Sequence, residues 1–211
     1  MRSRYYLVLI ALLAWAGLII QQYLLLANIP GNGLTPLQAV GRFLLFFTIL
    51  SNLMVAVSCT IQLLRPGSVA GRFFSKSSTQ TAICLYIVVV GLVYNIILRS
   101  LWKPTGLQLI ADNLLHVIVP AGFFLFWLLQ VKGQGLSWKQ IPGWLIYPAL
   151  YLCYALVRGN IEGVYAYPFI NPRVNGWPQV GINSVGMLLL FVLLGVGLTA
   201  IKKWQGRRAA A

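Results

Sequence analysis

Residues 80–101 read QTAICLYIVVVGLVYNIILRSL, an almost uninterrupted apolar run in which Arg99 is the only charged residue. A helix needs about 20 apolar residues to cross the hydrocarbon core of a bilayer. This run therefore predicts a membrane-spanning helix, and five similar runs predict an all-α, six-helix membrane bundle forming one domain over 1–211. The predicted spans are 5–27, 42–64, 80–101, 107–130, 141–158 and 180–201.

The composition excludes the main classes of soluble protein. Of the 211 residues 59% are hydrophobic and only 9% are charged, whereas a soluble domain has about 25% charged residues. The formal net charge is +14, from 16 lysines and arginines against two acids. Because the basic residues lie between the apolar runs instead of along one stripe, they indicate a membrane protein and exclude a nucleic-acid partner.

The distribution of the basic residues predicts the orientation. Eleven lysines and arginines flank the spans on the side of the two termini, and five flank them on the other side. The positive-inside rule then places both termini in the cytoplasm, and we expect an integral, multi-pass protein of the cell membrane. The eleven are Arg2, Arg4, Arg65, Arg72, Lys76, Lys132, Lys139, Lys202, Lys203, Arg207 and Arg208, and the five are Arg42, Arg99, Lys103, Arg158 and Arg173.

Two regions depart from plain apolar helix. Span 141–158 carries Pro142 and Pro148, which predict a kink. The external loop 159–179, GNIEGVYAYPFINPRVNGWPQ, is rich in proline, glycine and aromatic residues. It is either an ordered cap over the mouth of the bundle or part of an interfacial aromatic belt.

Polar residues collect near the external ends of the spans. Helix rise places Thr48 and His116 at comparable depth below that surface, whereas the inner half offers only small polar residues such as Ser58. Polar groups inside a bilayer are costly and usually face a functional interior. We therefore expect one polar site near the external face.

The spacing within span 107–130 suggests acid–base chemistry. Asp112 and His116 are four residues apart and share a helix face. His116 is suited to take a proton from the Thr48 hydroxyl, and Asp112 to orient the imidazole, so the predicted reaction is hydrolysis of a lipid ester. Further candidates for binding the substrate or an oxyanion are Asn52, Asn95, Arg99, Asn113, Arg158, Tyr165, Tyr167 and Asn183.

Each of these residues has a structural interpretation as well. A threonine in a membrane helix often bonds to its own backbone, and asparagines such as Asn52 and Asn95 often join helices. Asp112 can instead form an ion pair with Arg99 or Arg158. The alternative function is a transporter or lipid-binding protein with an Asp/His/Arg polar site, and a third is a structural or partner protein.

Metal and cofactor sites are not expected. The single histidine excludes a conventional zinc site, and no phosphate-binding or dinucleotide-binding motif is present. Cys59, Cys84 and Cys153 lie singly in apolar runs and are expected to be buried packing thiols. Membrane lipids and a lipid-like ester are the expected partners. Pro120, four residues after His116, deprives the His116 carbonyl of its helical donor and predicts a kink there.

Three segments carry a family resemblance: FFTILSNL at 46–53, ADNLLHVIVP at 111–120 and YPALYLCYALVRGNIEGVYAYPFINP at 147–172. Together they resemble the bacterial six-pass membrane proteins of the Pr6Pr type and, more distantly, the androgen-induced and androgen-dependent membrane proteins of eukaryotes. The eukaryotic proteins are threonine hydrolases that cleave fatty acid esters of hydroxy fatty acids.

The resemblance implies roles for matching positions. Thr48 stands where these relatives have their nucleophilic threonine, and His116, before Pro120, stands where they have their essential histidine. Their external tyrosine–proline–phenylalanine recurs at 167–169. The chain differs from them at Asn113 and Val117, where they carry a second histidine and a threonine.

Overall fold

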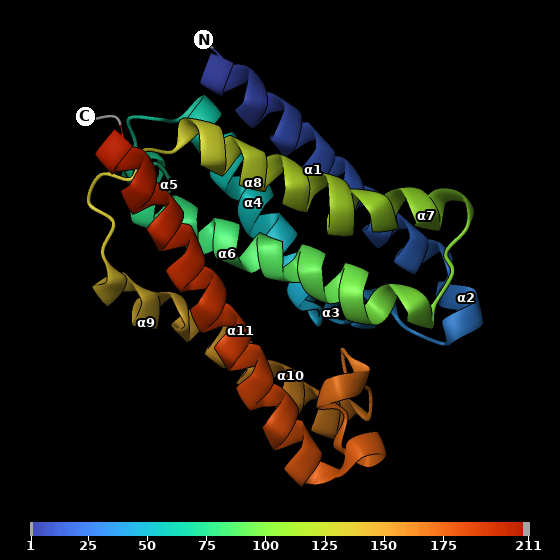
Figure 1. The fold of residues 1–211 in the computed structure, drawn as a ribbon. Coiled ribbons are helices and arrows are strands. Elements are labelled where there is room, and N and C mark those ends of the chain that lie inside the picture. The colour runs from blue at the N-terminus through green and yellow to red at the C-terminus, as the bar shows by residue number, and fades with distance from the viewer. Residues whose placement is uncertain (1, 209–211) are drawn as a thin grey trace. The chain divides into compact units, whose positions relative to one another are not determined.

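The computed structural model describes residues 2–208, which fold into helices joined by short loops, with no strand in that range (Figure 1). Six helical segments are long and apolar enough to cross a membrane, as expected of a multi-pass membrane protein, and the prediction of six apolar helices is confirmed. They are Arg4–Ala27, Phe47–Leu64, Ser77–Leu101, Gly106–Gln130, Trp138–Glu162 and Pro172–Arg208.

The described chain falls into two compact units, which meet in sequence between Gly135 and Leu136. The first unit holds four of the apolar segments. Its elements are α1 (Arg2–Ala27), α2 (Ile29–Asn32), α3 (Pro36–Leu44), α4 (Phe47–Leu64), α5 (Val69–Phe74), α6 (Ser77–Val93), η1 (Tyr94–Leu98), η2 (Arg99–Leu101), α7 (Gly106–Asn113), η3 (Leu114–Ile118) and α8 (Val119–Gln130).

Tryptophan–threonine hydrogen bonds join the helices of the first unit. Helix α1 packs against α4, and α6 packs against both α4 and α8. Trp15 Nε1 donates to Thr60 Oγ1 at 3.0 Å, linking α1 to α4. Trp127 Nε1 donates to Thr81 Oγ1 at 3.0 Å, linking α8 to α6. Each indole N–H thus has an acceptor within an apolar interface, where leaving it unpaired would be costly.

Replacing Thr60 with valine keeps the shape of the side chain but removes the acceptor of Trp15. Interhelical hydrogen bonds in membrane proteins are worth about 0.6 kcal/mol on average and up to about 1.7. We expect the free energy of unfolding to fall by about 0.5–1.7 kcal/mol, measured by SDS titration in detergent micelles. Thr105, which is exposed and makes no side-chain capping bond, is the control for a Thr→Val change. Equal unfolding curves for T60V and T105V would contradict the expectation.

The predicted span 42–64 is wrong at its start. Helix α3 ends at Leu44, and α4 begins only at Phe47. Thr35 and Gln38 form a reciprocal capping box at the start of α3, so α3 is a separate helix with its own cap. The break was not visible because the sequence stays apolar across it. Thr48 therefore lies in the first turn of a helix.

The second unit contains η4 (Trp138–Gln140), α9 (Ile141–Trp144), α10 (Ile146–Glu162), η5 (Pro168–Ile170) and α11 (Pro172–Arg208). The predicted kink is confirmed, because the helix is broken at Leu145, between α9 and α10. Cys153 on α10 is exposed, whereas Cys59 and Cys84 of the first unit are buried as expected.

The loop predicted over 159–179 is too long, since only residues 163–171 separate α10 from α11. Pro172 is the first residue of α11, a position that tolerates proline because its missing N–H has no intrahelical partner there. The helix is interrupted at Gly176, whose φ of 74° favours glycine, and then continues through Pro178.

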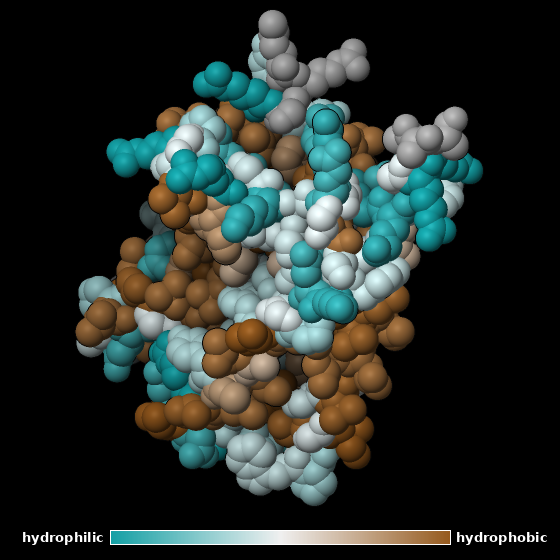
Figure 2. Space-filling model, turned by 90° about the vertical axis from the view of Figure 1, so that its left-hand side faces the viewer, coloured by the Kyte–Doolittle hydropathy of each residue, from teal (hydrophilic) through white to brown (hydrophobic). Residues whose placement is uncertain are grey.

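Large apolar side chains lie on the outside of the spans. In α1, for example, Leu9, Leu12 and Ile19 are more than half exposed. In Figure 2 hydrophobic residues, drawn brown, cover much of the middle and lower part of the face, and most of the hydrophilic residues, in teal, lie toward the top. Such surface is unfavourable in water and suits a lipid environment.

Candidate functional site

His116 lies in the middle of a π-helical turn, Leu114–Ile118, instead of a regular helix. In this turn the Val119 N–H donates to Leu114 O and not to Leu115 O. Pro120 has no N–H to offer to either Leu115 or His116. The sequence predicted a kink at Pro120, and the structure has a π turn there, which deprives two consecutive carbonyls of helical donors. Single π turns are frequent at functional sites.

Asn52 supplies the missing donor for the first of these carbonyls. Its Nδ2 donates to Leu115 O at 3.0 Å and to Thr48 O, one turn earlier in α4, at 2.9 Å. The residue is completely buried. One side-chain amide thus ties the first turn of α4 to the residue next to His116.

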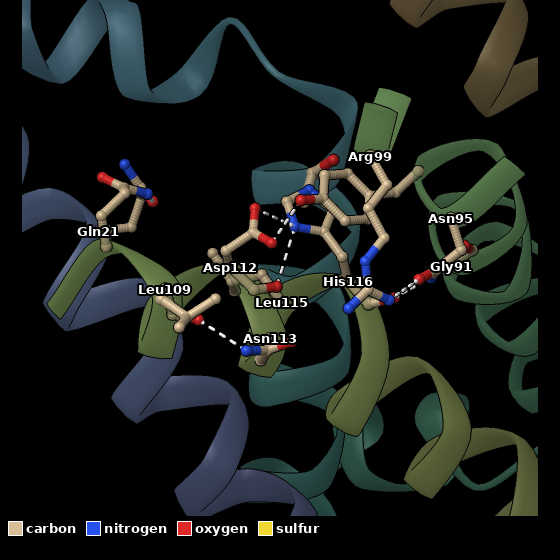
Figure 3. Close-up of polar contacts among 12 residues, drawn as sticks. Gln21, Gly91, Asn95, Arg99, Leu109, Asp112, Asn113, Leu115 and His116 are labelled. Carbon is tan, nitrogen blue, oxygen red and sulfur yellow. Dashed lines mark hydrogen bonds and ion pairs between the residues drawn. The ribbon is translucent and has the colours of Figure 1, made fainter. Parts of the chain in front are cut away.

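Asn95 supplies the second donor in the same manner. Its Nδ2 donates to His116 O at 3.2 Å and to Gly91 O, one turn earlier in its own helix, at 2.8 Å (Figure 3). We call these two amides the carbonyl bridges. Each uses both of its N–H groups on carbonyls, so neither asparagine can donate to an oxyanion in this arrangement. The sequence left open whether Asn52 and Asn95 join helices or bind an oxyanion. In the structure both join helices.

Gly91 allows the two helices to approach closely enough for these contacts. A Cβ atom at position 91 would lie 3.0 Å from Pro120 Cβ and 3.5 Å from His116 O. The first distance is shorter than real Cβ contacts usually are. A side chain here would push α6 away from α8 and lengthen the Asn95 bridge.

The imidazole of His116 faces Asp112, as the four-residue spacing predicted. His116 Nδ1 lies 3.3 Å from Asp112 Oδ1 and 3.0 Å from the Asp112 backbone oxygen (Figure 3). A backbone oxygen only accepts hydrogen bonds, and so does an ionised carboxylate. In the neutral form of the ring, these two acceptors favour the tautomer with the proton on Nδ1 and the free electron pair on Nε2.

Tyr94 completes this group and was not identified from the sequence. Its hydroxyl donates to Asp112 Oδ2, and its ring stacks on the His116 ring with centroids 3.8 Å apart and planes at 16°. Tyr94 and Asp112 are each only 4% exposed, whereas the His116 side chain is 16% exposed. An aromatic residue in an apolar span looks like a packing residue, and only its position beside Asn95 hinted otherwise.

The remaining candidates of the first unit are placed as follows. Thr48 is buried in the first turn of α4, and its backbone oxygen shares the Asn52 amide with Leu115. Arg99 Nη1 donates to Asn95 Oδ1 at 2.8 Å, so the side chain turns back along its own segment (Figure 3). Asn113 Nδ2 donates to Leu109 O at 3.0 Å, within its own helix.

Four further candidates belong to the second unit, where they order the loop after α10. Arg158 pairs with Glu162 and donates from Nη1 to the Tyr154 hydroxyl at 2.8 Å. Asn183 Nδ2 donates to Phe169 O at 2.8 Å.

The two loop tyrosines are also held by packing. The Tyr165 ring covers Gly159, where a Cβ would lie 2.3 Å from Tyr165 Cδ1. Tyr167 stacks on Phe169 with centroids 5.3 Å apart. The loop is therefore ordered, and these residues have structural roles within their own unit.

The described part of the chain contains no cluster of three or more histidine, cysteine, aspartate or glutamate side chains able to hold a metal ion. No protein-family model, curated protein or solved structure matches the chain.

Proposed function

We propose that this chain is an integral membrane hydrolase of lipid esters, with Thr48 as the nucleophile and His116 as the general base. The observation that carries the proposal is the environment of His116 Nδ1, which faces two acceptor atoms of Asp112. This arrangement leaves Nε2 as a proton acceptor, and it is the geometry by which an acid orients a catalytic histidine.

The proposed reaction proceeds in two acyl transfers. His116 Nε2 takes the proton of the Thr48 hydroxyl as its oxygen forms a bond to the ester carbonyl carbon. The imidazolium then gives this proton to the leaving alkoxide as the ester C–O bond breaks, which leaves an acyl-threonine. Water attacks the acyl group by the same proton transfers and regenerates Thr48, while Asp112 stabilises each imidazolium.

Two features support Thr48 in this role. Asn52 ties the turn that carries Thr48 to the turn that carries His116. Thr48 also lies in the first turn of an 18-residue helix, where the positive end of the helix dipole stabilises negative charge developing on nearby oxygens.

The charge distribution and the family resemblance complete the proposal. With both termini in the cytoplasm of a bacterial cell, the site lies toward the external leaflet of the inner membrane. Esters with acyl chains in that leaflet, such as fatty acid esters of hydroxy fatty acids, are the proposed substrates. Membership of the six-pass Pr6Pr-type family is part of the same proposal.

The alternative is a transporter or lipid-binding protein in which Asp112 and His116 hold a proton. The pairing of these two side chains in an apolar span favours this second candidate. It predicts pH-dependent ligand binding without turnover, and it predicts that Thr48→Ala binds as the wild type does.

A fluorophosphonate probe distinguishes the two functions, because it labels an activated hydroxyl covalently. We expect the purified wild-type protein to be labelled and both Thr48→Ala and His116→Ala to lose the label, while Thr48→Ser retains part of it. Thr105→Ala, an exposed threonine, serves as the matched control. Circular dichroism and size-exclusion chromatography establish that each variant is folded. Labelling of T48A at the wild-type level would overturn the assignment of the nucleophile.

A further inference from the structure

We infer that Tyr94 is a positioning residue, which holds His116 in the tautomer that leaves Nε2 unprotonated. Only the catalytic use of this tautomer, in which Nε2 accepts a proton from Thr48, rests on the proposed function. The tautomer itself is a property of the folded protein, and it is measurable whether or not any ester is hydrolysed.

The carboxylate of Asp112 is held at both oxygens. Oδ1 lies 3.3 Å from His116 Nδ1, and Oδ2 accepts the hydrogen bond from the Tyr94 hydroxyl. With both oxygens engaged, rotation of the carboxylate breaks one of the two contacts. Without the Tyr94 hydroxyl, the carboxylate of Asp112, a residue only 4% exposed, would lose its second donor. Rotating the carboxylate away from His116 would then cost less free energy.

The ring of Tyr94 restrains the imidazole in a second way. The two rings lie almost parallel, with centroids 3.8 Å apart, so the phenol covers one face of the imidazole and opposes its tilting. The next residue, Asn95, holds the His116 backbone oxygen. Consecutive residues of one segment therefore fix both the ring and the main chain of His116.

Tyr94 stands at the start of a π turn, Tyr94–Leu98, which lies against the π turn Leu114–Ile118 that carries His116. A positioning role and a packing role differ in what they require of this side chain. Packing needs only the ring, whereas positioning through Asp112 needs the hydroxyl. Tyr94→Phe removes the hydroxyl and keeps the ring, so it separates the two roles.

The experiment uses the fact that the chain contains one histidine. Labelling the protein with ¹⁵N-histidine gives imidazole signals from His116 alone, and the chemical shifts of the two nitrogens report which one is protonated. In the wild type we expect a single tautomer with Nδ1 protonated. In Tyr94→Phe we expect the Nε2-protonated tautomer to appear, by a shift of the two nitrogen signals toward each other. Tyr86→Phe, a buried tyrosine in α6 of the same span, is the matched control and should leave the signals unchanged.

Two further measurements make the result decisive. Asp112→Asn interrupts the same chain of contacts at its middle and should change the tautomer as Tyr94→Phe does, which provides a second test if one variant folds poorly. If the protein hydrolyses esters, Tyr94→Phe should lower kcat about 10-fold or more with little change in KM, as loss of a group that orients a functional imidazole typically does.

The outcomes separate this inference from the proposed function. Identical histidine spectra in the wild type, Y94F and Y86F would overturn the positioning role and leave Tyr94 as a packing residue. A changed spectrum in Y94F together with no hydrolysis by the wild type would support the positioning role and reject the hydrolase. A changed spectrum with a lowered kcat supports both.

Discussion

Replacing His116 with alanine is expected to lower kcat for ester hydrolysis about 10³-fold or more, because general base catalysis by a positioned side chain contributes about 10²–10⁴-fold. The chain has no second histidine to take over the role. The Thr48 hydroxyl would then have to lose its proton without a base, and a threonine hydroxyl is a weak nucleophile in that state. The assay is steady-state hydrolysis of a fluorogenic long-chain ester by purified protein in detergent, which measures kcat.

Ile118→Ala is the control for this measurement, since Ile118 lies in the same π turn with its side chain exposed. Added imidazole should restore part of the activity of H116A if the lost function is proton transfer. A kcat for H116A within a few-fold of I118A would remove the histidine from the mechanism and favour the binding protein.

Replacing Gly71 with alanine is expected to lower the free energy of unfolding by about 3 kcal/mol, the upper end of the usual range for overpacking. A Cβ atom at this position would lie 2.2 Å from Arg65 O and 2.6 Å from Pro66 O. Both contacts are to backbone, so no side chain can move aside to relieve them. The turn before α5 would have to open, and with it the connection between α4 and α6.

Gly67→Ala is the matched control, because a Cβ at position 67 meets nothing within 4 Å. Unfolding of both variants by SDS, followed by far-ultraviolet circular dichroism, measures the difference. Since α4 carries Thr48 and the segment after α6 carries Tyr94, G71A should also weaken the site. Equal stabilities of G71A and G67A would show that the turn is less rigid than its geometry implies.

The spans were predictable because a bilayer imposes a minimum length of apolar helix, and hydropathy detects that length directly. Helix interruptions were predictable only where a proline in the span indicates them, as with Pro148 just after the break at Leu145. The break between Leu44 and Phe47 lies inside a continuous apolar run, so nothing in the composition marks it. The early start of α11 was missed for the opposite reason, because proline and glycine there suggested a loop although they begin and interrupt a helix.

The parts of the site that depend on residue spacing within one span were predictable from the sequence. The four-residue interval between Asp112 and His116 anticipated their contact, and Pro120 anticipated a carbonyl without its helical donor. Tyr94 was missed because its partners, Asp112 and His116, lie in another span. The residues next to Tyr94 in the sequence give no sign of that contact. The π turns add to the difficulty, since they shift which side chains face the neighbouring helix.

The carbonyl bridges of Asn52 and Asn95 have a consequence for how much the surrounding sequence can vary. Both amides recognise main-chain oxygens, of Leu115 and His116, and every amino acid supplies such an oxygen. Leu115 can therefore be replaced by another apolar residue of similar volume while the carbonyl bridge from Asn52 remains. Saturation libraries at positions 52, 95 and 115 should accordingly accept replacements at 115 far more readily than at either asparagine.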